Sequence, residues 1–232
     1  LNGEGGNDTI RGYGGDDILN GGNGNDTLYG GNDNDSLNGD TGNDKLYGNN
    51  GNDTLNGGKG DDYLNGDRGN DTYVFGKDWG VDTIYNYDYY RTNDGSVDKI
   101  SFIDGISKDN LEFSTNSNHD LIIKMGDNKL TASNALATNS HYKISEIILG
   151  DEVLDYETIR ELALSGTNET QNIYGYEDKE NIILPNPMSV DKSVVRLSII
   201  PSLLNVYDYN KARNIKDINI YEISKVYDKE YN

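Results

Sequence analysis

The chain has 232 residues, with 40 acidic and 20 basic side chains, and a formal net charge of −20 at pH 7. This charge disfavours nucleic acid and anionic membranes as partners, and the lack of cysteine excludes disulfides and thiolate metal sites. Only 34% of the residues are hydrophobic, with no run of about 18 apolar residues to span a membrane. So low an apolar content predicts that something besides a hydrophobic core holds the chain together. The chain begins at Leu1 without a leader pattern, so we expect a piece of a longer protein.

Residues 1–75 repeat with a period of nine, which indicates a repeat architecture. Glycine recurs at Gly3, Gly12, Gly21, Gly30, Gly39, Gly48, Gly57 and Gly66. Five residues after each glycine stands an aspartate, at Asp8, Asp17, Asp26, Asp35, Asp44, Asp53, Asp62 and Asp71. Two residues further on stands a large hydrophobic residue, at Ile10, Leu19, Leu28, Leu37, Leu46, Leu55, Leu64 and Tyr73. The residue before each aspartate is always Asn or Asp.

Each repeat unit combines six turn-forming residues with three residues centred on the hydrophobic one, which predicts a tight loop and a very short strand. The hydrophobic residue points inward and its two neighbours point outward. One inward residue per unit forms no core alone, so two units per coil must stack as a parallel β-roll, an all-β fold. Residues 18 apart then lie about 4.8 Å apart. This spacing predicts an outward ladder of Asn20, Asn38 and Asn56 and a stack of Tyr29 on Tyr47.

The same stacking superimposes the aspartates in pairs. These pairs are Asp8/Asp26, Asp17/Asp35, Asp26/Asp44, Asp35/Asp53, Asp44/Asp62 and Asp53/Asp71. Bare carboxylates at that spacing repel strongly, and a hard divalent cation between successive loops removes the repulsion. Calcium fits better than magnesium, because it accepts about six to eight oxygen ligands in flexible geometry. We therefore expect about six calcium sites, one per pair, and expect residues 1–75 to fold only when calcium binds.

The unit from Gly21 to Tyr29 reads G-G-x-G-x-D-x-U-x, where U is a large hydrophobic residue, and the array resembles the RTX (repeats-in-toxin) family. The resemblance covers residues 1–75 and implies a β-roll whose calcium ions are held by the aspartates together with carbonyl groups of the loop glycines. These glycines are the eight named above and the inner glycines Gly6, Gly15, Gly24, Gly42, Gly51, Gly60 and Gly69. In one loop Asp33 replaces the inner glycine, and because Asp tolerates left-handed geometry we expect a strained but intact turn.

The nine-residue register slips after Asp71. The stretch 80–84 resembles a degenerate repeat, but its aspartate, Asp82, lies eleven residues after Asp71. Solenoids need a cap at their open end. We expect this cap to be formed by Tyr73, Val74, Phe75 and Trp79.

Residues 76–165 are predicted to form a β-rich capping domain. Short apolar runs at 99–102, 121–123 and 146–149 alternate with polar turns, and residues 155–164 fit one short helix. Residues 102–123 are also similar to the segment that often follows RTX blocks.

The last two segments are less regular. In residues 166–184 the nine-residue period returns without its aspartates, which predicts a degenerate repeat coil that no longer binds calcium. Residues 185–232 form a slightly basic tail, with 7 basic and 6 acidic side chains. This tail is similar in placement to the C-terminal signal of type I secreted proteins, and an ordinary terminal extension is the alternative.

No catalytic constellation stands out, and the chain is not expected to be an enzyme. His119 and His141 are isolated, and neither a zinc motif nor a nucleophile elbow is present. The tyrosines from Tyr85 to Tyr90 fit a recognition patch for sugar or protein, or simply an exposed edge strand with its turn.

The sequence therefore predicts a calcium-binding module that folds after export from a bacterium, with calcium and the type I secretion machinery as partners and an extracellular location. Two alternatives stay open. The chain is the end of a pore-forming cytolysin or secreted hydrolase whose active part lies upstream, or it is part of a calcium-rigidified surface adhesin or S-layer protein. Cell-surface retention would favour the adhesin, and free secretion the toxin or enzyme.

Overall fold

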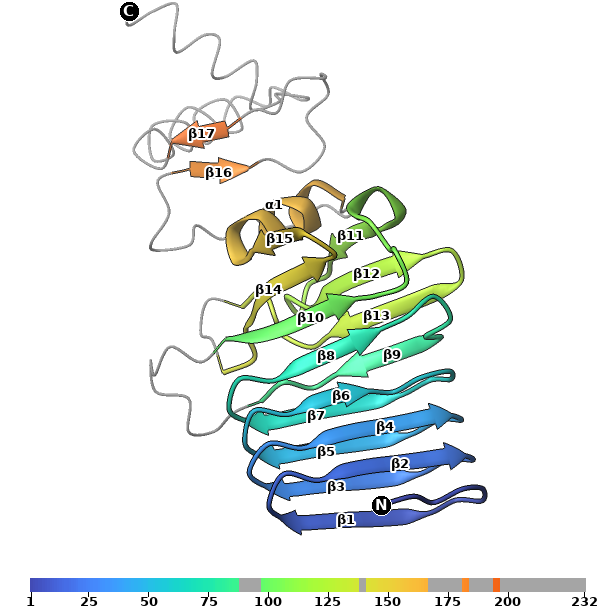
Figure 1. Cartoon of the computed structure of the whole chain (residues 1–232). Helices are drawn as coiled ribbons and strands as arrows, with labels where there is room; N and C mark the ends of the chain where they lie inside the picture. Colours follow the sequence, from blue (N-terminus) through green and yellow to red (C-terminus); the bar gives the residue numbers. More distant parts are fainter. Residues whose placement is uncertain (88–96, 138–140, 167–180, 184–193, 197–232) are drawn as a thin grey trace, which may run out of the picture. The chain divides into compact units, whose positions relative to one another are not determined.

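The computed structural model describes residues 1–87, 97–137, 141–166, 181–183 and 194–196 (Figure 1). Residues 1–169 make one compact unit and residues 170–232 a second one. The first unit contains the repeat array and all of the predicted capping domain. It is built on two long β-sheets that face each other.

The first sheet has eight strands in the order β1-β3-β5-β7-β9-β13-β12-β11. Their bounds are β1 Thr9–Gly14, β3 Thr27–Asn32, β5 Lys45–Asn50, β7 Tyr63–Arg68, β9 Val81–Ile84, β13 Asn128–Ala132, β12 Leu121–Met125 and β11 Glu112–Thr115. The second sheet has seven strands in the order β2-β4-β6-β8-β10-β14-β15. Their bounds are β2 Ile18–Asn23, β4 Ser36–Thr41, β6 Thr54–Asn56, β8 Thr72–Phe75, β10 Asp98–Phe102, β14 Ile144–Leu149 and β15 Glu152–Asp155.

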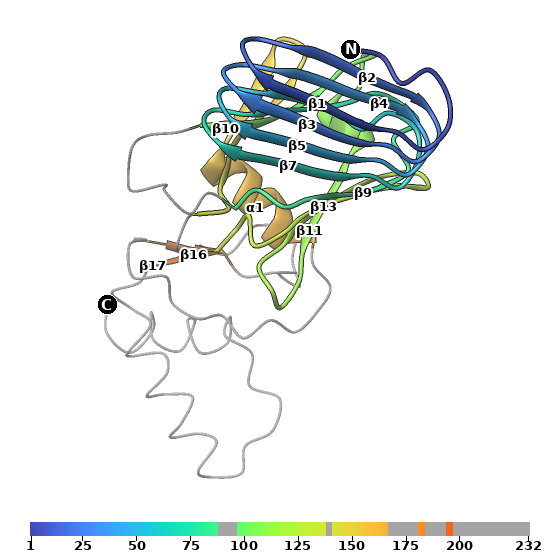
Figure 2. The ribbon, with the colours of Figure 1, turned by 90° about the horizontal axis from the view of Figure 1, so that it is seen from below.

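Every strand pair inside the array is parallel, and successive units alternate between the two sheets. Leu28 lies beside Leu46 in the first sheet and Leu19 beside Leu37 in the second, an offset of 18 residues in both. Two units therefore make one coil. Figure 2 views these coils from below, with the N terminus at the open end. The predicted parallel β-roll is confirmed.

The hydrophobic column of the repeats forms the core of the roll. Its members from Leu19 to Leu64, together with Tyr73, are at most 1% exposed, whereas Ile10 in the first coil is only partly buried. The outward ladders are also confirmed. Asn20, Asn38 and Asn56 lie side by side, and the rings of Tyr29 and Tyr47 stack with centroids 5.0 Å apart.

The two sheets continue beyond the repeats without a break. Strand β10 pairs parallel with β8, and β13 pairs parallel with β9. Strand β14 in turn pairs parallel with β10, and the pairing then becomes antiparallel, in β11-β12-β13 and in β14-β15. The boundary at residue 75 therefore separates repeat from non-repeat sequence, not two separate sheets.

The expected helix is α1, Tyr156–Gly166, and a short 3-10 turn covers Lys108–Asn110. The carboxylate of Asp155 accepts a hydrogen bond from the Thr158 backbone N–H at 2.9 Å, which satisfies a free donor at the start of α1. The helix contacts β11 and β14, so it covers the end of the stacked sheets. In the described part of the chain, no helix is long and apolar enough to cross a membrane.

The predicted cap needs one correction. Tyr73, Phe75 and Trp79 are buried, and Trp79 packs against Phe75 and Phe102. Val74 is only half-buried, because alternate residues of β8 face opposite sides of the sheet. The aromatic residues lie inside a continuing core, and residues 97–166 close the end of the roll.

In the second unit the structure describes only β16, Asn181–Ile183, and β17, Val194–Arg196, which pair antiparallel. The rest of the predicted degenerate coil, 166–184, and of the predicted tail, 185–232, lies outside the described residues apart from Gly166, the last residue of α1.

We expect the substitution Leu46→Ala to lower the free energy of unfolding of the calcium-loaded protein by about 2–5 kcal/mol, because the side chain is 0% exposed at the centre of the column. Denaturant unfolding followed by circular dichroism measures this loss. The control is Ile18→Ala, whose side chain is 66% exposed and whose replacement should change stability by less than about 0.5 kcal/mol. Equal losses for both variants would contradict the inward column.

Candidate calcium sites in the turns

A ladder of hydrogen bonds joins the aspartates of successive coils. The backbone N–H of Asp26 donates to Oδ1 of Asp44 at 2.7 Å, and the N–H of Asp44 donates to Oδ1 of Asp62 at 2.8 Å. The same bond recurs along both rows of turns, starting from Asp8 and Asp17. Each aspartate therefore uses one carboxylate oxygen to hold the preceding coil.

The Asn or Asp before each aspartate makes a second ladder in the opposite direction. Oδ1 of Asn7 accepts the backbone N–H of Asn25 at 2.8 Å, and Oδ1 of Asn25 accepts that of Asn43 at 2.9 Å. One residue of the pair thus accepts from the coil above it and its neighbour from the coil below. This explains why the position before the aspartate is restricted to Asn or Asp, for which the sequence alone offered no reason.

In seven aspartates of the array the second carboxylate oxygen has no donor. Asp26, Asp35, Asp44, Asp53 and Asp62 are at most 3% exposed, and their Oδ2 atoms are buried without a hydrogen-bond partner. The Oδ2 atoms of Asp8 and Asp17 are also buried without a hydrogen-bond partner, although these two residues as a whole are only half-buried. A buried carboxylate oxygen without a partner carries a large desolvation penalty, so each of these turns requires a cation or a proton.

Glycine keeps the space beside each carboxylate open. A methyl group placed on Gly21 would lie 2.5 Å from Oδ2 of Asp26 and 2.8 Å from the carbonyl oxygen of Gly39 in the next coil. A carboxylate oxygen and a carbonyl oxygen from successive coils thus converge at one place. Any side chain at Gly21 would fill it.

The inner position of each loop needs a left-handed backbone. Gly24 and Gly42 have φ of +128° and +129°, and Asp33 occupies the equivalent position with φ of +73°. Oδ2 of Asp33 accepts the backbone N–H of Gly15 at 3.1 Å, which supports the left-handed turn. The substitution therefore preserves the loop.

Burial raises the pKa of the stacked aspartates. It raises the pKa of Asp44 and Asp53 to about 7 and that of Asp62 to about 6. Carboxylates of neighbouring coils add to the effect at Asp44 and Asp53, and the adjacent carboxylate of Asp61 adds to it at Asp62. The pKa of Asp35 is raised by burial and by nearby carboxylates as well. These carboxyl groups resist ionisation because they are buried close to other carboxylates.

The donor set fits calcium. Among the described residues, no group of three or more His, Cys, Asp or Glu side chains lies close enough together to hold a metal ion. An ion in the turns would therefore need main-chain carbonyl oxygens besides the aspartates, and calcium accepts such a mixed set of oxygen ligands. The glycine carbonyls facing the unpartnered Oδ2 atoms supply that kind of ligand.

The structure extends the aspartate columns by two residues that the repeat period missed. The N–H of Asp62 donates to Oδ1 of Asp82 at 2.9 Å, and the N–H of Asp71 donates to Oδ1 of Asp98 at 2.8 Å. Both residues stand two positions before an inward hydrophobic residue, Ile84 or Ile100. The spacing of two residues between aspartate and hydrophobic residue could have identified both positions from the sequence. The nine-residue period could not, because neither residue lies nine positions after the preceding aspartate of the array.

The residues predicted outside the array stay apart from the turns. The ring of His141 lies 5.9 Å from that of Tyr87, and Tyr85 continues the outward tyrosine stack from Tyr63. His119 lies in a left-handed turn, with φ of +60°. Tyr89 and Tyr90 lie outside the described residues.

We expect the calcium-free protein to lose stability as the pH rises from 3.8, the ordinary Asp pKa, to about 8. The folded-state pKa values of Asp44, Asp53, Asp62 and Asp82 lie above the unfolded value, so the folded state binds more protons in this window. Circular dichroism in EDTA at a series of pH values follows this loss of the folded roll. Stability that rises with pH across this window would contradict the buried, uncompensated carboxyls.

Part of the chain is similar to an aminoacyl-tRNA synthetase. Residues 151–232 match the family described as "Phenylalanyl tRNA synthetase beta chain CLM domain". The phenylalanine–tRNA ligase beta subunit of Geobacillus kaustophilus is 44% identical over 54 residues, which cover 23% of this chain and 7% of that protein. The corresponding subunit of Bacillus subtilis is 34% identical over 67 residues, which cover 28% and 8%. We did not predict this similarity from the residues.

The array itself matches a calcium-binding family. Residues 2–37 and 38–73 each match the family described as "RTX calcium-binding nonapeptide repeat (4 copies)". The Iron-regulated protein FrpA of Neisseria meningitidis serogroup C is 40% identical over 111 residues, which cover 46% of this chain and 10% of that protein. The chain thus spans a tenth or less of the length of these relatives. The repeats, the stacked turns and these matches together show that residues 2–73 belong to the family of RTX calcium-binding nonapeptide repeats.

Proposed function

We propose that residues 1–75 are a calcium-dependent folding module, unfolded where calcium is scarce and folded into the roll where calcium is abundant. One observation carries this proposal: the turns stack buried aspartates, such as Asp44 and Asp53, whose Oδ2 atoms meet no protein donor. Calcium held by the aspartates and the glycine carbonyls would supply the positive charge that offsets their desolvation and mutual repulsion. Because the glycine-rich loops lose much conformational entropy on folding, binding and folding would be coupled.

We further propose that the module belongs to a secreted bacterial protein and folds after export. The RTX repeats support this role. Calcium sites of extracellular modules have dissociation constants on the order of 10⁻⁴–10⁻³ M, far above the free calcium of a cytosol. The chain would leave the cell unfolded through the secretion machinery, and folding outside would prevent its return.

A calcium titration of the full chain followed by circular dichroism tests the coupling. We expect the strand signal to be weak in EDTA at neutral pH and to rise with calcium, because only the ion neutralises the turns there. Magnesium should be a poor substitute, since it requires stricter octahedral geometry and keeps its waters. A full strand signal in EDTA would contradict the proposal.

Two single-residue variants connect this titration to the turns. We expect Asp44→Asn to weaken calcium binding by a factor of about 10 or more. Loss of a residue that only supports a metal ligand typically costs about that factor, and Asp44 is proposed as a ligand itself. The matched control is Asp40→Asn, because Asp40 is exposed and lies outside the stacked column. Asn also tolerates the left-handed backbone at this position, where φ is +72°. Equal titration midpoints for the two variants would place calcium elsewhere.

For a longer protein that carries this module, we propose two alternatives. A pore-forming cytolysin or secreted hydrolase would carry its active part upstream, and a surface adhesin would use the calcium-stiffened roll as a spacer. Cell fractionation of the parent distinguishes them, since an adhesin stays on the surface and a toxin or enzyme is released.

A second candidate function concerns residues 151–232, on the basis of their similarity to the synthetase beta chain. This segment has 15 acidic and 9 basic residues, a balance that opposes binding to the phosphates of tRNA. Under this candidate the tail 185–232 belongs to a module related to that synthetase subunit. Under the first candidate it is the export signal or an ordinary terminal extension.

Deletion of residues 185–232 separates the two candidates for the tail. If the tail is the export signal, the shortened chain should stay inside the cell. Unchanged export would contradict that role and leave the synthetase-like module or an ordinary terminal extension. In either case the shortened chain should keep its calcium-induced strand signal, since residues 1–169 form their own compact unit.

A further inference from the structure

We propose that Asp82, which lies outside the nonapeptide repeats, supplies the carboxylate of one additional calcium site at the upper end of its column. This inference rests on the proposed calcium-dependent folding of the array. It adds a site that the nine-residue period does not predict.

Asp82 is in register with the array despite the two-residue insertion before it. Oδ1 of Asp82 accepts the backbone N–H of Asp62, as Asp62 does for Asp44. Gly80 has φ of +81°, and a methyl group on it would lie 2.0 Å from the carbonyl oxygen of Gly60 in the coil below. Ile84 pairs with Leu64 and is 0% exposed. The insertion is therefore absorbed before Gly80, and the second half of the loop matches a repeat.

The carboxylate of Asp82, like those of the array, has one buried oxygen that accepts no hydrogen bond. Its side chain is 1% exposed, and its Oδ2 is buried without a hydrogen-bond partner. The nearby backbone N–H of Val81 donates to Oδ1 of Asp61 instead, at 3.1 Å. The protein thus leaves one oxygen of a fully buried acid to be satisfied by something else.

At the upper end of the other aspartate column, which ends at Asp98, a side chain of the protein donates a hydrogen bond to the buried carboxylate. Oδ2 of Asp98 accepts a hydrogen bond from Nδ2 of Asn86 at 2.6 Å, and Asn86 is 2% exposed. The hydroxyl of Tyr73 donates to Oδ1 of Asn86 and fixes its orientation. An amide donor ends the Asp98 column, and among the described residues Asp82 has no counterpart to it.

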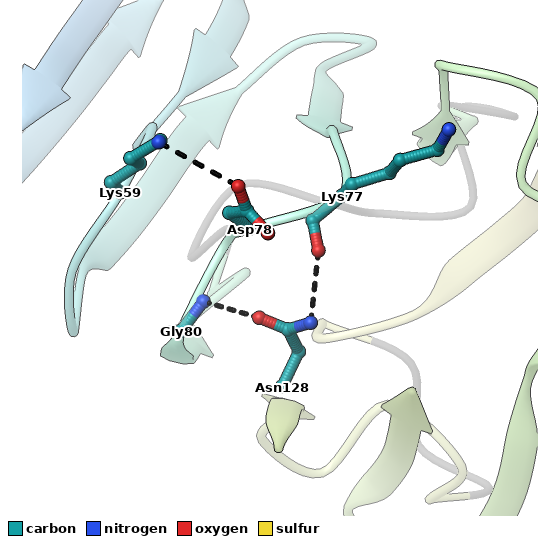
Figure 3. A network of polar contacts seen from close by, with 5 residues as sticks. All are labelled: Lys59, Lys77, Asp78, Gly80 and Asn128. Carbon is teal, nitrogen blue, oxygen red and sulfur yellow. Dashed lines mark hydrogen bonds and ion pairs between the residues drawn. The ribbon is translucent and has the colours of Figure 1, made fainter. Parts of the chain in front are cut away.

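Figure 3 shows the contacts that hold the loop before Asp82, namely two hydrogen bonds of Asn128 and one ion pair of Asp78. Nδ2 of Asn128 donates to the carbonyl oxygen of Lys77, and Oδ1 of Asn128 accepts the N–H of Gly80, both at 2.9 Å. Lys59 pairs with the exposed Asp78 at 3.6 Å. Asn128, at the start of β13, thus fixes the loop between Lys77 and Gly80.

Terbium luminescence of the full chain tests the site, because terbium replaces calcium and is excited by a nearby aromatic ring. Trp79 is the only tryptophan, and three residues span at most about 11 Å, so an ion at Asp82 would lie close to it. We expect tryptophan-sensitised terbium emission that calcium competes away. Asp82→Asn should abolish most of this emission and lower the number of calcium ions bound, measured by equilibrium dialysis, by one.

The matched control is Asp78→Asn, which removes an exposed carboxylate next to Trp79 and should leave both readouts unchanged. Unchanged emission and calcium number in Asp82→Asn would overturn the inference, because the acid would then need only a proton. If that variant does not fold, the wild type still decides, since terbium binding without tryptophan-sensitised emission overturns the site. A wild type that binds no calcium at all would instead overturn the proposed folding module.

Discussion

The stacking of one buried carboxylate on the next is the interaction on which the rest of this structure depends. A parallel roll with a strict nine-residue period places chemically identical groups about 4.8 Å apart along each row of turns. For leucine this proximity is favourable, and for aspartate it is costly. Asp44, for example, uses Oδ1 to accept a backbone N–H of the coil below it and leaves Oδ2 without a donor. Such a turn therefore requires a cation or a proton that the chain itself does not provide.

The two ladders of the turns make the coils depend on one another. Asn25 accepts from the coil above, and the adjacent Asp26 accepts from the coil below. Disturbing one turn therefore weakens the turns on both sides. Stability in such an array is a sum of nearest-neighbour terms, so charge compensation in one turn supports the next turn as well. This coupling gives a physical reason for the whole array to respond together to a divalent cation.

The end of the roll shows how a solenoid stops. Beyond β13 in one sheet and β14 in the other, the strand pairing changes from parallel to antiparallel, and α1 covers the last strands. The polar columns end differently from the apolar core. In one column the amide of Asn86 satisfies Asp98, and in the other the Oδ2 of Asp82 is left without a protein partner. The two rows of turns are therefore not equivalent at this end.

The sequence by itself determined the parallel roll, its inward leucine column, the outward ladders of Asn38 and Tyr47 and the stacked aspartates. A period of nine fixes all of these, because it sets the spacing of every residue before any long-range contact is known. Only the tertiary structure decided that Asp82 and Asp98 continue the columns, at offsets of 20 and 27 residues. Insertions between coils change the count along the chain but not the register of the sheet, which is set by backbone hydrogen bonds between strands. The same holds for the partner of Asp98, since no local pattern brings Asn86 to its carboxylate.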